Sequence, residues 1–358
     1  MTSNPYQDLP KQSFWRTGVS ETGVRAYPNF WTSKWQLARN ARFSTYGSCF
    51  AQHISRELRG RKMNWVDAEK APRRTPEDLA RSYNYGVYSA RNGNIYTTRQ
   101  LLQWVRMASH PKTSDAIENW EIGGRFFDSL RPAIEPGGFR SDEEAKVSRR
   151  FAAECFAKSI KEAEVFVFTL GLTEGWENAN TGQVYAVCPG TLAGTFDLEK
   201  HVFKNYRYRE ISDDLEGAIE LMLEMNPDLR VLLTVSPVPL TATASKNHVL
   251  TATTYSKSVL RAVAGDLAAD HPFIDYFPSY EVITGPPSGG AFYEDNLRSV
   301  AREGVDVVMG YFFEGLRLDQ SSHTAQSGAE ERLRRIIEAE EAQELICEEM
   351  ALERENAG

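Results

Sequence analysis

Short β-rich runs alternate with segments of helical periodicity from Ala41 onward, and this alternation limits the fold more than any other feature of the chain. Strands that are separated by helices usually pair in parallel, because each crossover returns the chain to the same end of the sheet. The sequence therefore predicts an α/β fold with a central parallel sheet. The runs that resemble buried strands are 42–46, 165–170 (VFVFTL), 231–235 (VLLTV) and 273–277 (FIDYF).

The segments between these runs have the periodicity and end signals of covering helices. One helix is predicted to begin after Ser141, an N-cap that acidic residues follow, and to bury Val147, Phe151 and Cys155. At this spacing Cys155 is predicted to be a packing residue. Ser212 is predicted to cap the helix before the third strand. Further predictions are buried Leu215, Ile219 and Met222 in that helix, a helix over 252–268, and one over 301–314 that buries Val305, Val308, Met309 and Phe312.

The chain divides by composition into one domain and a tail. Residues 1–318 are predicted to form the α/β domain, and residues 84–140, which have few strongly periodic segments, are predicted to be a long insertion. Such insertions often build a substrate pocket above a sheet. Residues 319–358 are predicted to be an acidic helical tail. Its Glu-rich part, 327–350, is predicted either to be solvated or to pair with a second copy as a homodimer.

Charge and composition exclude several classes of protein. Lys and Arg total 41 against 49 Asp and Glu, so the formal charge of -8 gives no general attraction to nucleic acid or to an anionic membrane. The N-terminal region is polar and Pro-rich, unlike a signal peptide, and no apolar run approaches about 18 residues. The four cysteines lie far apart, without zinc-site spacing. We expect a cytoplasmic protein with reduced thiols, no metal or cofactor, and no nucleic-acid or membrane partner.

The sequence Gly47-Ser48-Cys49-Phe50-Ala51 lies where the first predicted strand ends and a helical run begins. It is the segment of the chain that most clearly indicates catalytic residues. A glycine before two nucleophiles at such a turn exposes a side chain at a helix N-terminus, where unpaired N–H groups favour negative charge. A thiol in that position can ionise with a pKa of about 7 or lower, whereas a serine needs a positioned base. The alternative is a tight structural turn, in which Ser48 caps the helix and Cys49 fills a small buried space.

This pentapeptide matches the name-giving motif of the GSCFA family, which resembles a branch of the SGNH/GDSL hydrolase superfamily. The resemblance implies a three-layer α/β/α sandwich around a central parallel sheet, of the SGNH or flavodoxin-like kind, and hydrolysis or transfer of acyl groups. The motif is specific for the family rather than for a substrate. Other matching positions are Asn4-Pro5-Tyr6, Phe14-Trp15-Arg16, Thr169-Leu170-Gly171, Ser236-Pro237-Val238 and Ser256-Lys257.

The first block of SGNH enzymes, Gly-Asp-Ser, indicates the nucleophile. Laid onto this chain, the glycine falls on Gly47, the aspartate on Ser48 and the nucleophile on Cys49. The resemblance therefore implies a thiol where the superfamily has a hydroxyl. The opposite register, with Ser48 as the nucleophile, stays open.

The resemblance also implies oxyanion and substrate-binding groups in three places. The first is the backbone N–H near Phe50. The second is a glycine, for which Gly86 and Gly93 are candidates and Gly86 is preferred. The third is Gly171-Leu172-Thr173-Glu174, which is similar to the Gly-x-Asn-Asp block and includes Gly171, Thr173 and Glu174 as binding residues. Thr173 replaces the Asn donor, so its hydroxyl would take the place of an amide.

The base is the part of the SGNH pattern from which this chain departs. The superfamily block Asp-x-x-His is similar to Asp295-Asn296-Leu297-Arg298, which has Arg298 where the His would be. His248 is the first substitute base, because it follows strand 231–235 at the sheet edge where ligands bind; a surface-loop role is the alternative. Asp295 or Arg298 would assist it. Other interpretations are that Arg298 holds a thiolate or an anionic substrate group, or that it forms an ion pair with Asp295 or Glu294. His53, one turn after Cys49, would raise the thiolate fraction of Cys49, with packing or solvent exposure as its alternative role. His323, after Asp319, imitates an acid–base pair but has one residue too many.

We therefore expect an esterase-type hydrolase or O-acyltransferase that forms a covalent acyl-enzyme at Cys49 or Ser48. Acetyl is the expected acyl group, and a carbohydrate or polysaccharide precursor is the implied substrate, because related bacterial SGNH proteins often modify polysaccharide. The alternative is a non-catalytic glycan-binding or scaffold module that keeps the fold but has lost the typical His and Asn. Trp15, Trp31, Trp35 and Trp176 are candidates for stacking on sugar faces, with packing as their alternative role.

Overall fold

The computed structural model describes residues 4–319 and 345–352. The chain falls into two compact units, the first from Met1–Arg39 with Phe277–His323 and the second from Asn40–Tyr276 with Thr324–Gly358. The second unit contains the central sheet and the candidate site.

The second unit is built on a five-stranded sheet with the strand order β11-β10-β6-β2-β3, in which every pair is parallel. The central parallel sheet is therefore confirmed, and each of the four predicted strands is present with its ends shifted by no more than a residue. Five of the six positions in β2 and all six in β6 are buried, as a strand covered on both faces requires. The bounds are β2 Arg42–Gly47, β3 Asn64–Trp65, β6 Val165–Leu170, β10 Arg230–Val235 and β11 Ile274–Tyr276.

The strand order places a topological switch point between β2 and β6. From β2 the chain first adds β3 on one side, and it then returns to add β6, β10 and β11 on the other side. In open parallel sheets, ligands bind in the crevice outside the carboxyl ends of the strands at such a point. The Gly47–Cys49 turn lies at the end of β2, at this point.

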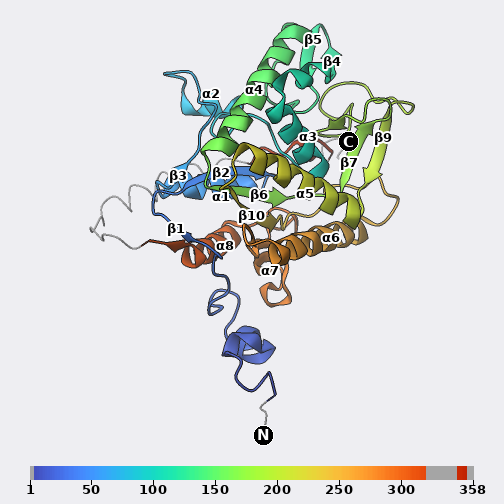
Figure 1. The fold of residues 1–358 in the computed structure, drawn as a ribbon. Helices are drawn as coiled ribbons and strands as arrows, with labels where there is room; N and C mark the ends of the chain where they lie inside the picture. The colour runs from blue at the N-terminus through green and yellow to red at the C-terminus, as the bar shows by residue number, and fades with distance from the viewer. Residues whose placement is uncertain (1–3, 320–344, 353–358) are drawn as a thin grey trace. The chain divides into compact units, whose positions relative to one another are not determined.

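Four long helices connect and cover the sheet. Right-handed connections place α4, α5 and α6 on one face and α1 on the other. α5 packs against both α4 and α6, and these three helices cross the side of the sheet that faces the viewer in Figure 1. The bounds are α1 Ala51–Gly60, α4 Asp142–Glu162, α5 Tyr208–Met225 and α6 Val249–Asp270.

The buried face of α4 differs from the prediction. Ser141 is the N-cap as predicted, its hydroxyl accepting from Glu144 N at 3.1 Å, and Cys155 is buried. Val147 and Phe151, however, are 50% and 55% exposed, so assigning them to the core was wrong. The face turned inward instead contains Ala145, Arg149, Ala152, Phe156 and Ile160.

The start of α5 also differs from the prediction, whereas its buried face does not. The helix begins at Tyr208 with Arg207 as N-cap, and Ser212 lies inside it, with its hydroxyl donating to Glu216 at 2.9 Å. The predicted cap at Ser212 was therefore wrong. Leu215, Ile219 and Met222 are buried as predicted.

Residues 84–140 contain regular structure that the sequence analysis did not predict. α3, Thr98–Ser109, begins with a capping box in which the Thr97 hydroxyl and the Gln100 side chain each accept from the other's backbone N–H. It packs against α4 and α5 and so belongs to the core of the second unit. The other elements of this range are the short helix η3 Pro111–Ala116 and a hairpin of β4 Asn119–Ile122 with β5 Arg125–Asp128, and α2 Glu77–Ser82 precedes the range.

A second, antiparallel sheet follows β6 and has the order β8-β7-β9. Its central strand β7, Glu174–Asn178, begins three residues after Gly171, so the chain passes directly from the sheet edge into this sheet. The flanking strands are β8 Val184–Tyr185 and β9 His201–Asn205.

The first unit is smaller and pairs β1, Gln36–Leu37, in parallel with β12, Arg317–Leu318. Its main helix is α8, Arg302–Gly315, in which Val305, Val308, Met309 and Phe312 are buried as predicted. The other elements are the short helices η1 Lys11–Ser13, η2 Arg16–Ser20 and η4 Pro286–Ser288, and α7 Ser279–Thr284. The predicted helix 327–350 lies mostly outside the described residues, whose C-terminal part includes one 3-10 turn, η5 Glu348–Met350.

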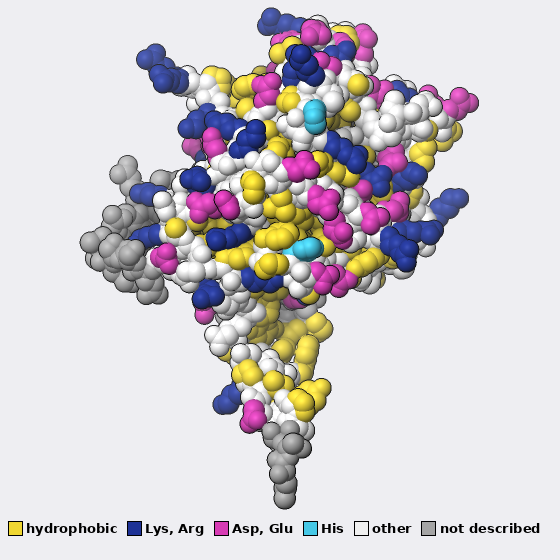
Figure 2. All heavy atoms as spheres, viewed as in Figure 1, with side chains coloured by type: hydrophobic (Ala, Val, Ile, Leu, Met, Phe, Trp, Pro, Cys, Tyr) yellow, Lys and Arg dark blue, Asp and Glu magenta, His cyan; other side chains and the backbone are white. Residues whose placement is uncertain are grey.

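The viewed surface mixes both signs of charge. Figure 2 shows Lys and Arg side chains interspersed with Asp and Glu over this face, rather than gathered into one basic area. Within the described ranges, no helix combines the length and apolarity needed to cross a bilayer.

A buried cluster of ion pairs joins the β4–β5 hairpin to α4. Asp128 accepts from Arg131 Nε at 2.7 Å and from Arg149 Nε at 2.9 Å, and all three side chains are fully buried. Arg149 also donates to the carbonyls of Ser114 and Ile117. Burial raises the pKa of Asp128, but the two guanidinium groups outweigh it, so the pKa of Asp128 lies below its ordinary value. The buried Arg149 explains why the inner face of α4 is not its most apolar face.

We predict that Asp128→Asn lowers the free energy of unfolding by about 3–5 kcal/mol, because it leaves two guanidinium groups buried without their counter-charge. Asp115→Asn is the matched control, since Asp115 pairs with Arg150 of the same helix while more than a third exposed. It should change stability by less than about 1 kcal/mol. Because the pKa of Asp128 is lowered by folding, the difference between wild type and Asp128→Asn should shrink as the pH falls below about 4. Equal urea-denaturation midpoints for the two variants would contradict this account.

Candidate functional site

Gly47 allows the backbone of β2 to lie close against the backbone of β6 at the sheet edge. It has a φ of +132° and pairs with Thr169 of β6. A Cβ atom on residue 47 would lie 2.3 Å from the Thr169 carbonyl oxygen and 2.7 Å from its nitrogen, well inside van der Waals contact. Only glycine fits both this conformation and this space.

Ser48 is buried between the two strands. Its N–H donates to Thr169 O at 3.1 Å, which extends the parallel ladder one residue beyond β2. A Cβ atom on Gly171 would lie 2.9 Å from Ser48 Cβ, so Gly171 makes room for the serine side chain. Ser48 is 3% exposed, and its hydroxyl has no hydrogen-bond partner within the described part of the chain. Ser48 therefore has the surroundings of a packed side chain, with no base beside its hydroxyl.

Cys49 opens the turn that leads into α1. Its carbonyl accepts from Gln52 N at 3.1 Å, and the Ser48 carbonyl accepts from Ala51 N at 2.9 Å. Phe50 is the N-cap residue and supplies no side-chain cap, and its N–H donates to no acceptor in the described ranges. The thiol is thus placed at an uncapped helix N-terminus, although Cys49 is only 4% exposed.

His248, the predicted base, and His53, considered for raising the thiolate fraction of Cys49, lie in different surroundings. His248 is exposed and caps α6, its Nδ1 accepting from Leu250 N at 3.2 Å. His53 lies one turn after Cys49 and packs on the Phe50 ring, with the two ring centroids 5.2 Å apart. Burial, with a smaller effect of Arg56, lowers the pKa of His53 to about 3. His53 is therefore neutral near pH 7 and adds no positive charge beside the thiol.

Asp295 and Arg298 lie in the first unit, on the turn before α8. Asp295 is exposed, whereas Arg298 is 9% exposed and its N–H donates to Asn296 Oδ1 at 2.9 Å. The structure thus does not bring these two residues together with Cys49 within one unit. His323 lies outside the described residues.

The structure separates Gly86 from the turn. The Gly86 carbonyl accepts from Arg59 Nη1 at 2.9 Å, near the C-terminal end of α1, whereas Cys49 precedes the N-terminal end. A helix of this length separates its ends by roughly 15 Å. The segment that reaches the turn is 93–96, because Ile95 N donates to Gly47 O at 2.9 Å. Gly93, the other candidate, begins this segment.

The block after β6 is held by several buried polar contacts. Tyr96 O accepts from the N–H groups of Gly171 and Leu172 at 3.2 and 2.9 Å. The Lys257 ammonium, 1% exposed, donates to Gly171 O at 2.7 Å. The Thr173 hydroxyl donates to Asn205 Oδ1 at 2.7 Å and is fully buried. Its proton is therefore already used, which weakens its proposed role as a substitute for the Asn donor.

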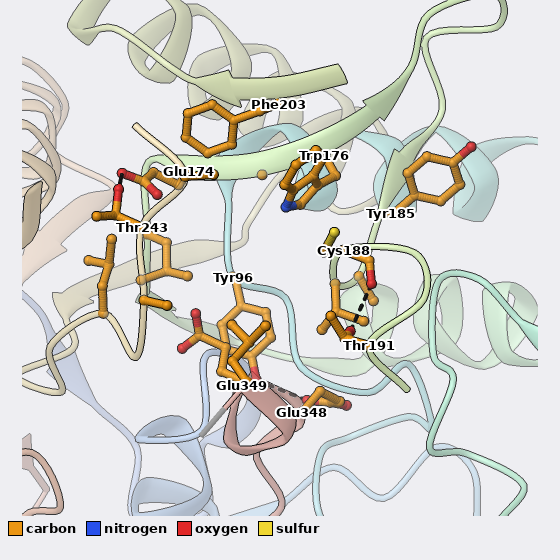
Figure 3. Close-up of a pocket in the computed structure, with 18 of the residues that line it drawn as sticks. Tyr96, Glu174, Trp176, Tyr185, Cys188, Thr191, Phe203, Thr243, Glu348 and Glu349 are labelled. Atoms are coloured by element: carbon orange, nitrogen blue, oxygen red, sulfur yellow. Dashed lines mark hydrogen bonds between the residues drawn. The ribbon is translucent and has the colours of Figure 1, made fainter. Parts of the chain in front are cut away.

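A cavity of about 210 Å³ lies beside this block, with walls from β7, β8, β9 and the loop after β10. Figure 3 shows Trp176 and Phe203 on one side of it and Tyr96 with Glu349 on the other. Glu174 accepts from the Thr243 hydroxyl at 2.7 Å, and burial raises the pKa of this carboxyl. The cavity thus presents aromatic rings and carboxylates. Among the described residues, no group of His, Cys, Asp or Glu side chains is arranged to hold a metal ion.

A polar network beside the turn was not predicted from the sequence. The Tyr88 hydroxyl donates to Ser48 O at 3.1 Å and also contacts Asn94 Oδ1. Gln52 Nε2 lies 3.4 Å from both the Tyr88 hydroxyl and Asn94 Oδ1. In the segment Gly93-Asn94-Ile95-Tyr96, only Gly93 was predicted as a possible site residue, as a candidate oxyanion glycine. Buried Gln52 and Asn94 beside a glycine-rich turn are the signal that could have found this network.

We predict that Gly47→Ala lowers the free energy of unfolding by about 3 kcal/mol or more, because the new methyl group meets the backbone of β6. Gly182→Ala is the matched control: Gly182 also has a positive φ, +70°, but an added Cβ meets nothing within 4 Å. Gly182→Ala should lower the free energy of unfolding by about 1 kcal/mol. Urea unfolding followed by circular dichroism measures both, and similar midpoints would show that the close approach is not a constraint.

One protein family matches the part of the chain that contains the turn. The family model described as the GSCFA family matches residues 42–312, which begin at the first residue of β2. This range includes Cys49, the block after β6 and most of the cavity wall, and it excludes residues 345–352. No curated protein sequence matches the chain.

Proposed function

Because the chain belongs to the GSCFA family, we propose that it is an SGNH-like acyl-ester hydrolase or O-acyltransferase that uses Cys49 as its nucleophile. The observation that carries this proposal is the turn itself. Cys49 stands at the carboxyl end of β2, at the switch point of a parallel sheet and at the N-terminus of α1. The strand order, which corresponds to 2-1-3-4-5 in a doubly wound sheet, also supports an SGNH-like sandwich.

In the proposed reaction the Cys49 thiol gives its proton to His248 Nε2, and the resulting thiolate attacks the ester carbonyl carbon. The ester C–O bond then breaks, and the alcohol leaves with the proton that His248 returns. The acyl group is then on sulfur as a thioester, and water or an acceptor hydroxyl releases it. The Phe50 N–H, which has no described acceptor, is the proposed oxyanion donor. His248 remains the proposed base through Nε2, because its Nδ1 is used in the cap of α6.

Cys49 is preferred over Ser48 for a physical reason. A serine needs an adjacent base to become nucleophilic, and the Ser48 hydroxyl has no partner within the described residues. A thiol at a helix N-terminus needs less help, because the helix dipole favours the thiolate.

We predict that Cys49→Ala lowers kcat/KM for acetylated sugars and short acyl esters by at least about 1000-fold, since the covalent step is lost. Ser48→Ala should stay within about tenfold of wild type, because no hydrogen bond is removed. Cys49→Ser should lie near the alanine variant. Cys155→Ala is the control: Cys155 is a buried cysteine whose pKa burial raises to about 12. Loss of activity in Ser48→Ala alone would assign the nucleophile to Ser48.

The cavity beside the 171–174 block is the proposed carbohydrate subsite. Trp176 and Phe203 offer flat faces for a sugar ring, and Glu174 offers a carboxylate for its hydroxyl groups. We predict that Trp176→Ala raises KM by about three- to tenfold with little change in kcat, because stacking is lost equally from substrate and transition state. Leu198→Ala, at a residue 85% exposed, is the control. An unchanged KM would show that the sugar does not bind against Trp176 in this cavity.

The second candidate function is a non-catalytic glycan-binding module. The observation that favours it is the set of typical catalytic groups that are absent or occupied: the Thr173 hydroxyl already donates to Asn205, and His248 is an exposed helix cap. Calorimetric titration with acetylated and deacetylated oligosaccharides separates the two functions. Equal binding of both sugars, without turnover by wild type, would favour the binding module.

A further inference from the structure

We propose that Gln52, Asn94 and Tyr96 form a peptide-binding site over Cys49, and that its ligand is the chain's own segment Leu345–Leu352. This segment would close the candidate site and shield the thiol. The inference rests on the proposed function only for the role of Cys49 as a nucleophile. The contacts described below do not depend on it.

Gln52 recognises the backbone of the segment. Its Nε2 donates to Ile346 O at 2.7 Å, and its Oε1 accepts from Ile346 N at 3.2 Å. One side-chain amide thus satisfies both the N–H and the C=O of a single residue, as a neighbouring β-strand would. Asn94 Nδ2 adds a second donor to Ile346 O at 2.9 Å. Such contacts read an extended backbone and are independent of its side chains.

Glu348 supplies the side-chain part of the recognition. Its carboxylate, on a residue 5% exposed, accepts from the Tyr96 hydroxyl at 2.9 Å and from Asn94 Nδ2. Figure 3 shows Tyr96 and Glu348 joined by this bond, with the Glu349 carboxylate directed toward the cavity. Hydrogen bonds to a charged group are the stronger kind, so the site selects an acidic residue two positions after the backbone clamp.

Two groups of this network contact the backbone at Cys49: Gln52 N donates to the Cys49 carbonyl at 3.1 Å, and the Tyr88 hydroxyl donates to the Ser48 carbonyl at 3.1 Å. Burial raises the pKa of Tyr88, and the charges of Cys49, Glu348 and Cys347 raise it further. The pKa of Tyr96 is raised by burial first and then by the charges of Cys347, Glu348 and Cys49. Both tyrosines therefore lie within electrostatic reach of the candidate nucleophile and of the C-terminal segment. With the segment bound, Cys49 is 4% exposed.

The boundaries of the family match favour a shielding role over a catalytic one. The match over residues 42–312 contains Gln52, Asn94, Tyr96 and Cys49, whereas the segment lies beyond it. The site is thus part of the family domain, and its occupant is an addition to that domain. A group required for the family's reaction would be expected inside the matched range.

The test measures the rate at which iodoacetamide alkylates Cys49 in the full chain, by mass spectrometry of peptides. Glu348→Lys should speed this labelling by at least about tenfold, because the charge-assisted bonds to Tyr96 and Asn94 are lost. Ile346→Pro, which removes the N–H that Gln52 Oε1 accepts, should do the same. Ala351→Lys is the control, because it adds positive charge to the same segment at a side chain with no polar group to lose, and it should stay within about twofold. Cys155 should remain unlabelled in every variant, which shows that the fold is intact.

A synthetic peptide of residues 345–352, with Ser at position 347, should slow Cys49 labelling again in Glu348→Lys, and a scrambled peptide should not. The proposal is overturned if Cys49 labels at one rate in wild type, Glu348→Lys and Ile346→Pro, or if Ala351→Lys matches Glu348→Lys. It is also overturned if protection in wild type is lost on dilution, because the segment then acts between copies. Failure of the proposed function would look different: the variants would show faster labelling while no form of the protein cleaves an ester.

Discussion

The candidate site depends on one close contact between two backbones, that of β2 at Gly47 and that of β6 at Thr169. No side chain fits between them at residue 47, where a Cβ atom would lie 2.3 Å from the Thr169 oxygen. Because the strands meet so closely, Ser48 can pack against Gly171 and the chain can turn at once into α1. The Tyr96 carbonyl and the Lys257 ammonium then fix the backbone after β6. Together these contacts set Cys49 at the switch point of the sheet.

The sheet and its helices could be predicted because burial leaves a plain pattern in the sequence. A strand covered on both faces is a continuous apolar run, and VFVFTL corresponds to β6 residue for residue. The inner face of α4 could not be predicted in this way. Arg149 is buried there by its ion pair with Asp128, while Val147 and Phe151 face outward, and apolar periodicity does not register a paired charge. α3 could have been predicted from the sequence, because the Thr97–Gln100 capping box marks its start and its buried Leu101, Trp104, Val105 and Ala108 recur at helical spacing.

Part of the candidate site was predicted. The predicted parts are short local motifs, whereas the missed parts join residues that lie far apart in the sequence. The turn 47–51 and the block 171–174 are local motifs, and the structure places both at the same sheet edge. The polar network combines Gln52, Tyr88 and Asn94 with Glu348, about 250 residues from Asn94 along the chain. No spacing rule relates such positions, since only the fold and the C-terminal segment bring them together. The same reason explains why Gly86 was preferred over Gly93 from the sequence, although the structure places Gly86 beside Arg59, at the end of α1 that is far from Cys49.

A covalent intermediate at Cys49 would be trapped as an acyl adduct on its sulfur. The protein is mixed with an activated acyl ester, quenched in acid within one turnover, and digested for peptide mass spectrometry. We expect an acyl adduct on the peptide that contains Cys49, and neutral hydroxylamine should remove it as it removes a thioester. An adduct on Ser48 that resists neutral hydroxylamine, or turnover of the ester without any adduct, would contradict this expectation.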